Sequence, residues 1–338
     1  MDSIKKSIIF ISLLLAPLAA IFISLLLGRY PLAPTTVMAV ILNHLGITSF
    51  GTPDTAASIV MNIRLPRSIL GALVGASLAV SGAAFQGVFR NPLVSSSILG
   101  VSPGAGFGAA LAILIFTNNS LMIYVFAFGF GILTVLLSYL IGRSYNTTPA
   151  IMLVLGGTIV SSVFSSLISL VKYLADPTDQ LPKITFWLMG SLASASYRDI
   201  MIAGVPMMLG IGGLIAIRWR INILSMGDKE ARALGVNLGL LKGILITCAT
   251  LATAGAVCVS GTIGWVGLII PHIARMLIGN DNRLLIPVSL SLGACYLMLV
   301  DNVSRILTGS EIPLGILTAI IGAPFFVYLL KRKAGGWA

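Results

Sequence analysis

The chain is a succession of long, charge-free apolar stretches separated by short polar and basic segments. A helix needs about 20 mostly apolar residues to cross a bilayer. Five stretches have about that length without being divided: 7–28, 68–89, 200–217, 284–300 and 312–330. Each of them predicts one membrane-spanning helix.

Three uncharged stretches are too long for one helix or lack clear limits. Turn-forming residues divide them at Asn118-Asn119, after Pro149, and at Ser260-Gly261. The division gives helices near 96–116 and 120–141, one after Pro149, one before residue 260, and a shorter one after it that Pro271 interrupts. The pattern therefore predicts ten spans.

Two further apolar segments need separate interpretation. The segment 31–50 is uncharged, but its prolines, threonines, Asn43 and His44 are unfavourable in a membrane-spanning helix, so we expect it on the membrane surface.

The first apolar stretch follows Lys5 and Lys6, as in a signal peptide. Its 22 uncharged residues exceed the roughly 7 to 15 of a signal core, and no A-x-A site follows. We interpret it as the first spanning helix.

Composition agrees with this pattern. Hydrophobic residues make up 57% of the 338 residues and charged residues only 9%, against about 25% charged in soluble domains. The expected fold class is all-α: a polytopic membrane protein of about ten transmembrane helices, forming a single transmembrane domain over residues 1–338.

The basic residues predict the orientation of the chain. With ten spans and the amino terminus inside, 14 Lys and Arg fall on the inner side and seven on the outer side. The positive-inside rule then places both termini in the cytoplasm and the protein in the cytoplasmic membrane. The net charge of +11 is dispersed without aromatic interleaving, so we expect contact with membrane lipid and no nucleic-acid partner.

The chain carries no recognisable enzymatic motif. It has neither H-E-x-x-H nor a G-x-x-x-x-G-K-[ST] phosphate loop, so we expect no catalysis, no nucleotide site, no bound cofactor and no metal. All ten acidic residues fall in loops or near helix ends, which argues against an intramembrane proton relay.

The three cysteines show no CxxC spacing, so we expect no disulfide, metal or redox role for them. His272 is expected to bond the backbone freed by Pro271, and His44 to be solvated.

Hydroxyl side chains recur every three or four residues along the span after Pro149, including Ser161, Ser162 and Ser165. Two interpretations stay open. The hydroxyls bond the preceding helical turn or a neighbouring helix, or they line an uncharged polar pathway along which a large hydrophilic cargo slides.

The inner loop at 225–236 predicts a short helix. Ser225 with Asp228 has the spacing of a capping box, and Gly235 supplies a stop. An isolated helix of two turns is unstable in water. It is expected to dock on something, either a partner or the surface of its own protein.

Several long motifs, taken together, resemble the FecCD family, the permease subunits of ABC importers for ferric siderophores, haem and cobalamin. They are R-L-P-R at 64–67, R-N-P-L at 90–93, G-V-S-P-G-A-G at 100–106, G-W-V-G-L-I-I-P-H-I-A-R at 264–275, and the ending from Glu311 to Phe326. The likeness runs from about Ser7 to Leu330. It departs at Trp265, where the family more often has Phe.

The resemblance implies the bundle of a type II ABC importer permease, working as a homodimer or with a sister permease around a central pathway. Two cytoplasmic ATPases, which use ATP and Mg, and an extracytoplasmic substrate-binding protein are the implied partners. The segment 225–236 matches the coupling helix that docks on the ATPase, with Asp228, Ala231, Arg232, Leu234 and Gly235 as its coupling residues.

The resemblance also implies two other functional regions. Asn91 and Leu93, with Thr147 and Thr148, match the cytoplasmic mouth of the pathway. Arg64, Arg67 and Arg305 are expected on the outer rim, where the family's arginines meet glutamates of the binding protein. The alternatives for these arginines are snorkelling to lipid phosphate and a local Arg305–Asp301 pair.

We interpret the chain as a permease for a metal chelate, with a ferric siderophore favoured, haem and cobalamin as alternatives, and a small oxyanion such as molybdate as a further one. The rival classes are an ion-coupled carrier and an intramembrane enzyme. Transport that requires ATP but survives collapse of the ion gradient separates the importer from the carrier, and the missing active-site acids weigh against the enzyme.

Overall fold

The computed structural model describes residues 3–116, 119–143 and 149–333. Within these ranges the chain is helical and contains no strand. The elements are α1 (Ser3–Leu26), α2 (Pro34–His44), α3 (Asp54–Ser58), the π-helical turn η1 (Ile59–Arg64), α4 (Leu65–Phe89), α5 (Val101–Phe116), α6 (Ser120–Gly142), α7 (Ala150–Leu174), α8 (Gln180–Met189), α9 (Tyr197–Met226), α10 (Asp228–Ala233), α11 (Leu238–Ser260), α12 (Val266–Ile278), α13 (Asn282–Leu307) and α14 (Leu314–Lys333).

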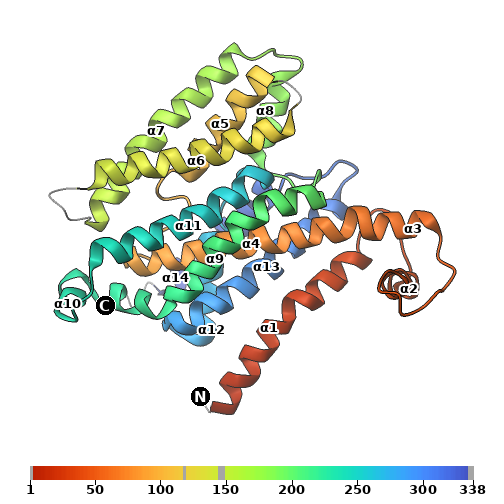
Figure 1. The fold of residues 1–338 in the computed structure, drawn as a ribbon, viewed down its shortest axis with the longest axis horizontal. Helices are drawn as coiled ribbons and strands as arrows, with labels where there is room; N and C mark the ends of the chain where they lie inside the picture. The colour runs from red at the N-terminus through yellow and green to blue at the C-terminus, as the bar shows by residue number, and fades with distance from the viewer. Residues whose placement is uncertain (1–2, 117–118, 144–148, 334–338) are drawn as a thin grey trace.

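The all-α membrane fold predicted from the sequence is confirmed. In the described ranges, six helices are long and apolar enough to cross a membrane. Four shorter apolar helices, in α1, α5, α12 and α14, lie where the sequence predicts the other spans. The number of apolar helices is thus consistent with about ten spans. The segment 31–50 contains α2, which is set apart from the bundle and lies beside α3 and the end of α1 (Figure 1).

The helix α4 is the centre of the bundle. It packs against α9, α11, α12 and α13, and most of its side chains are buried. It continues without a break from α3 and η1, so one apolar helix runs from Asp54 to Phe89. This differs from the predicted start at residue 68, because the charges of Arg64 and Arg67 do not end the helix.

Glycines let α4 approach two neighbours backbone to backbone. A Cβ added at Gly75 would lie 2.2 Å from the carbonyl oxygen of Gly293 in α13, and one at Gly82 would lie 1.9 Å from the carbonyl oxygen of Gly267 in α12. Both distances are shorter than any real Cβ contact. The small residues of the sequence therefore form the helix contacts on which the bundle is built.

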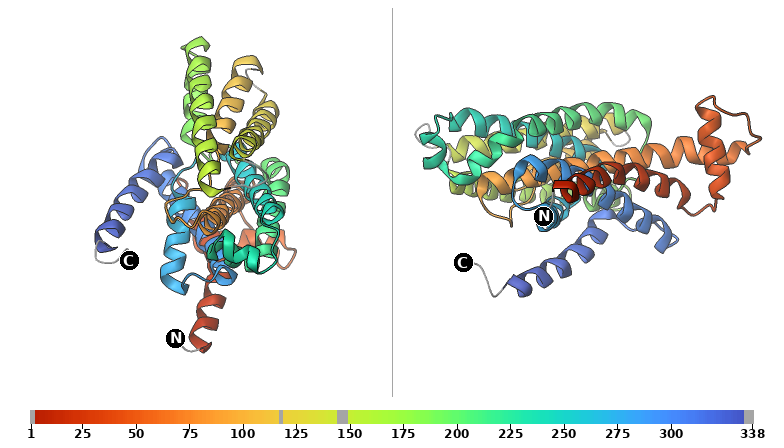
Figure 2. Two further views of the ribbon diagram at one scale, coloured as in Figure 1. Left: turned by 90° about the vertical axis from the view of Figure 1, so that its left-hand side faces the viewer. Right: turned by 90° about the horizontal axis from the view of Figure 1, so that it is seen from below.

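A second group of helices lies against this centre. Helices α5, α6 and α7 lie side by side on one flank, and α14 lies on another (Figures 1 and 2). Much of α7 remains exposed, because only 28% of its most apolar window is buried within the chain. Helix α1 begins, and α14 ends, toward the end of the bundle that carries α10, while α2 and α3 mark the opposite end (Figure 1).

We expect Gly82→Ala to destabilise the bundle, because its methyl group forces α4 and α12 apart. Overpacking of this kind costs about 1–3 kcal/mol. Thermal unfolding of the purified chain in detergent should show a lower midpoint for this variant. Gly243→Ala in α11 is the matched control, since nothing lies within 4 Å of its added Cβ. Equal midpoints for the two variants would contradict the close-contact interpretation.

Candidate functional site

The short helix predicted in the inner loop is present as α10, and its end is a Schellman motif. The N–H of Val236 bonds the carbonyl of Ala231 (3.2 Å) and the N–H of Gly235 bonds that of Arg232 (2.9 Å). Gly235 has a φ of +74°, which glycine adopts without strain. The predicted stop at Gly235 is confirmed.

The predicted capping box at the start of this helix is wrong. Gly227, not Ser225, is the N-cap residue. Ser225 still belongs to α9, where its hydroxyl donates to the carbonyl of Ile221 (2.7 Å). The sequence misplaced the cap because α9 extends to Met226, well past its apolar stretch.

A buried lysine fixes α10 to the bundle. Lys242 in α11 is only 2% exposed, and its ammonium lies 2.8 Å from the Asp228 carboxylate at the start of α10. Ala231 is fully buried against the same core. Leu234, by contrast, is 61% exposed, and Arg232 and Gly235 are exposed with it. The helix thus has an anchored face and a free face. Ala231, which we expected at the partner surface, lies on the anchored face.

The residues predicted at the mouth of the pathway lie beside α10. Asn91 and Leu93 are exposed in the turn after α4, where the Asn91 carboxamide oxygen accepts from the Leu93 N–H (2.9 Å). Thr147 and Thr148 lie outside the described residues. A pocket of about 720 Å³ connects this turn with the start of α7 and with the start of α10. The turn predicted to form the mouth and the start of α10 therefore line the same pocket.

The hydroxyl stripe of α7 shows features of both interpretations. Ser162 and Ser166 donate to carbonyls four residues back (3.0 Å each), as the back-bonding interpretation predicts. Ser162 and Ser165 are nevertheless exposed, and Ser161 is half-buried. A back-bonded hydroxyl still presents its oxygen to whatever lies outside the helix, so the exposed surface of α7 carries an uncharged polar stripe beside apolar side chains such as Ile159 and Val163.

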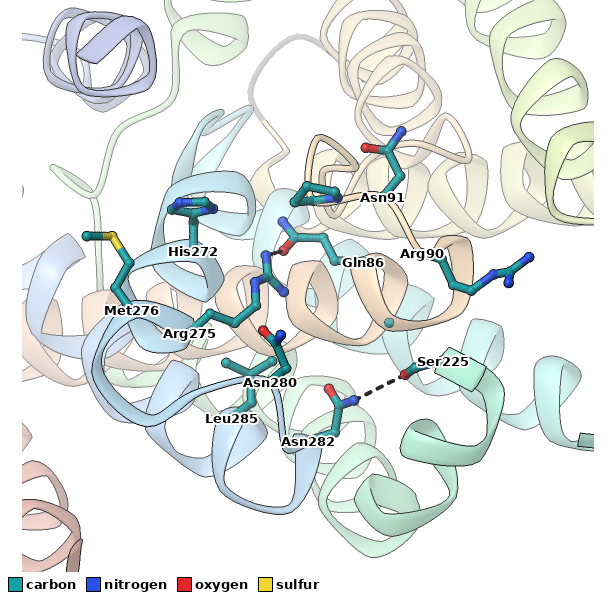
Figure 3. Close-up of a pocket in the computed structure, with 12 residues that line it drawn as sticks. Gln86, Arg90, Asn91, Ser225, His272, Arg275, Met276, Asn280, Asn282 and Leu285 are labelled. Atoms are coloured by element: carbon teal, nitrogen blue, oxygen red, sulfur yellow. Dashed lines mark hydrogen bonds between the residues drawn. The ribbon is translucent and has the colours of Figure 1, made fainter. Parts of the chain in front are cut away.

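Gln86 is a functional candidate that the sequence analysis missed. Pro271 has no N–H and so leaves the carbonyl of Gly267, four residues earlier, without its helical donor. The carboxamide of Gln86 donates to that carbonyl (3.3 Å) and to the carbonyl of Val94 in the mouth segment (3.0 Å), and its oxygen accepts from Arg275 (Figure 3). Gln86, rather than the expected His272, donates to this carbonyl, and the ring of His272 lies edge-on to that of Phe326 with 6.5 Å between the ring centres.

The three arginines expected on an exposed outer rim are buried instead. Arg64, Arg67 and Arg305 are between 3% and 6% exposed. Arg64 donates to the carbonyls of Leu25 (2.7 Å) and Leu26 (3.2 Å), and thereby caps the end of α1. Its place in a continuous helix turns it toward α1 rather than outward.

Arg67 is the centre of a buried ionic network. Its guanidinium binds Asp301 (2.8 Å) and, in a bidentate arrangement, Glu311 (2.9 Å for both oxygens). Arg305 lies 3.3 Å from the same Asp301, so the alternative of a local pair is confirmed. These partners already occupy both guanidinium groups, and we do not assign them to a binding protein.

The network also affects the titration of its least buried acid. Burial alone would raise the pKa of Glu311, but the hydrogen bonds and charge of Arg67 outweigh it and hold that pKa below its ordinary value. The contribution of Glu311 to the free energy of unfolding is therefore complete above the ordinary pKa of a glutamate and is lost as the pH falls through the lowered value.

The described ranges contain no cluster of three or more His, Cys, Asp or Glu side chains that could hold a metal ion.

We expect Arg67→Met to lower the free energy of unfolding by about 3 kcal/mol or more, because it leaves Asp301 buried with one remaining cation. Thermal unfolding in detergent measures this loss. Arg198→Met is the control, since Arg198 is exposed and surface changes usually stay within about 0.5 kcal/mol. If both variants unfold together with the native protein, Arg67 does not have the structural role described.

Comparison with known proteins shows the family. Residues 14–332 match the model of the FecCD transport family. The molybdate import system permease protein MolB of Haemophilus influenzae is 42% identical over 337 residues, which cover 99% of this chain and 98% of that protein. A probable iron chelatin transport system permease protein of Helicobacter pylori is 43% identical over 277 residues, covering 82% and 83%.

A solved structure agrees with these relatives. It is described as an inward-facing conformation of a metal-chelate type ABC transporter, and it is 40% identical, with a TM-score of 0.85 over 96% of this chain and 99% of that one. The chain belongs to the FecCD transport family and is a permease subunit of an ABC transporter.

Proposed function

We propose that this chain moves a metal chelate inward across the cytoplasmic membrane, and that it has no catalytic activity or bound cofactor of its own. Partner ATPases hydrolyse ATP with Mg and supply the energy, and an extracytoplasmic binding protein delivers the cargo. Both termini then lie in the cytoplasm with α10. The common placement of the start of α1, the end of α14 and α10 toward one end of the bundle supports this orientation (Figure 1).

One observation carries the proposal: α10 is anchored on one side and free on the other. The Lys242–Asp228 pair and the buried Ala231 hold it to α11 and the core. Leu234 and Arg232 on the free side are exposed, and no described part of the chain covers them. An exposed leucine beside a charged residue is suited to a partner groove. Since α10 adjoins the mouth turn, a displacement of α10 by the ATPase reaches the mouth directly.

The pathway in this proposal runs along the exposed face of α7. A second permease chain, either a copy or a sister, places a like face opposite, and the two enclose a polar, uncharged wall with Ser161, Ser162 and Ser165. Asn91 and Leu93 close its inner end. Such a wall carries no fixed charge that would trap a hydrophilic cargo. The exposure of the α7 hydroxyls supports this arrangement.

We expect Leu234→Asp to uncouple the permease from its ATPase without unfolding the bundle. Removing an apolar contact and burying a carboxylate there costs a few kcal/mol. The variant should lose co-purification with the ATPase or ATP-driven uptake in proteoliposomes, while its thermal midpoint stays native. Leu45→Asp, with equal chemistry at an equally exposed position beside α2, is the control. Normal coupling in the Leu234 variant would refute the docking role of α10.

For the cargo, we favour a ferric siderophore, as in the sequence interpretation, and the iron chelatin relative supports it. Haem and cobalamin remain alternatives from the family resemblance. Molybdate is a second candidate, because the molybdate permease of Haemophilus influenzae matches nearly the whole chain.

Uptake into proteoliposomes that contain the complete importer distinguishes these cargoes. We expect ATP-dependent accumulation of the iron chelate and none of molybdate. The reverse result would assign the chain to oxyanion import and leave its role as a permease intact. Uptake of either one that follows an ion gradient without ATP would reject the importer itself.

A further inference from the structure

A second pocket lies at the α10 end of the bundle, between α4, α9, α12 and α13 (Figure 3). Its volume is about 610 Å³, within the roughly 300–1,000 Å³ of small-molecule sites. Its polar side chains include Gln86, Arg90, Asn91, Arg275, Asn280 and Asn282. The pocket shares Asn91 with the mouth turn, but the proposed pathway and the docking of α10 do not use Arg275, Asn280 or Asn282.

The charge of this pocket is positive and lacks an internal balance. None of its twelve lining residues is an acid. Asp281 stands between two lining residues, but its carboxylate accepts from the Asn222 side chain (2.7 Å) and from the Arg283 N–H (2.9 Å). No ion pair found in the described part of the chain includes Arg275.

The guanidinium of Arg275 is held in place but not neutralised. It donates to the carboxamide oxygen of Gln86, and Gln86 is itself fixed by the carbonyls of Gly267 and Val94. A guanidinium has five N–H donors, so one neutral acceptor leaves most of its capacity unused. A half-buried cation without a counter-charge is costly. The pocket is therefore pre-organised for an anionic group with several acceptor oxygens.

The rim of the pocket indicates where this anion comes from. Met276 lines the pocket and is 55% exposed, and the neighbouring Leu277 is also exposed. Nearby along the chain, the guanidinium of Arg283 lies 5.9 Å from the centre of the Trp219 ring, and Trp219 is exposed. Exposed Trp and basic residues are typical of the membrane–water interface. A basic pocket beside an apolar rim at that depth suits a phospholipid, with its phosphate inside and its acyl chains outside.

We propose that this pocket binds a phosphate group, supplied by an anionic phospholipid of the adjoining leaflet. Arg275 binds the phosphate, and Gln86 holds Arg275 in position. Gln86 also donates to the carbonyl of Val94 in the mouth segment. A headgroup bound to Arg275 therefore stabilises the position of Gln86 and, through it, of that segment. The proposed function gives only the side of the membrane, and the binding itself does not depend on transport.

The test measures lipid binding to the purified full chain in detergent. Phosphatidylglycerol is titrated by native mass spectrometry, with phosphatidylcholine of the same acyl chains and inorganic phosphate as comparison probes. We expect phosphatidylglycerol to bind best, and Arg275→Gln to weaken it about tenfold, the usual loss for a charged hydrogen bond. Arg220→Gln removes an exposed charge on nearby α9 and should change the affinity less than twofold.

A second variant keeps the test decisive if the first fails to fold. Gln86→Glu retains Arg275 but gives it an internal carboxylate, so it should abolish phosphatidylglycerol binding. Unchanged binding in both pocket variants would overturn the proposal. Inorganic phosphate that binds as tightly as the lipid, with the same loss in Arg275→Gln, would overturn the lipid source. No transport is measured, so failure here leaves the proposed permease function standing.

Discussion

The bundle depends on glycine contacts around α4, where the backbones of neighbouring helices touch without a side chain between them. In lipid, apolar side chains gain little by leaving their surroundings, so helices associate mainly through close packing and interhelical polar contacts. Gly82 against Gly267 and Gly75 against Gly293 supply that closeness to α12 and α13. The other polar features described here, from Gln86 to the Arg67 network, become possible because these helices lie near enough for side chains to span between them.

Polar groups within the bundle are used in two different ways at its two ends. At the end that carries α2 and α3, Arg67 joins α4 to α13 and to the segment before α14 through Asp301 and Glu311, and the charges largely compensate one another. At the α10 end, Arg275 donates a hydrogen bond to the neutral Gln86 and forms no ion pair with the described residues. The first arrangement is closed and structural. The second leaves the charge of Arg275 without a counter-charge, which suits it to bind an anionic ligand rather than to join two helices.

The sequence alone predicted those features that neighbouring residues determine, namely the apolar helices and the end of α10. Charge-free length located the apolar helices, and Gly235 marked the end of α10, because both signals are carried by neighbouring residues. It failed for contacts between distant segments: Asp301 and Glu311 lie 234 and 244 positions from Arg67, and no periodicity shows that they meet. Charge counting placed Arg67 and Arg305 on the outer side but carried no information on burial. A signal for Gln86 did exist, since a lone amide within an apolar span needs a partner and Pro271 frees a carbonyl.

The unbroken helix from Asp54 to Phe89 has a mechanical consequence. Its 36 residues correspond to a rod of about 54 Å at 1.5 Å per residue, well beyond the roughly 30 Å hydrocarbon core of a bilayer. It carries α2 and α3 at one extremity and the mouth turn at the other, with the glycine contacts between them. Because no loop interrupts this helix, a force applied at Asp54 would be transmitted along it, past the glycine contacts, to the turn at 90–93.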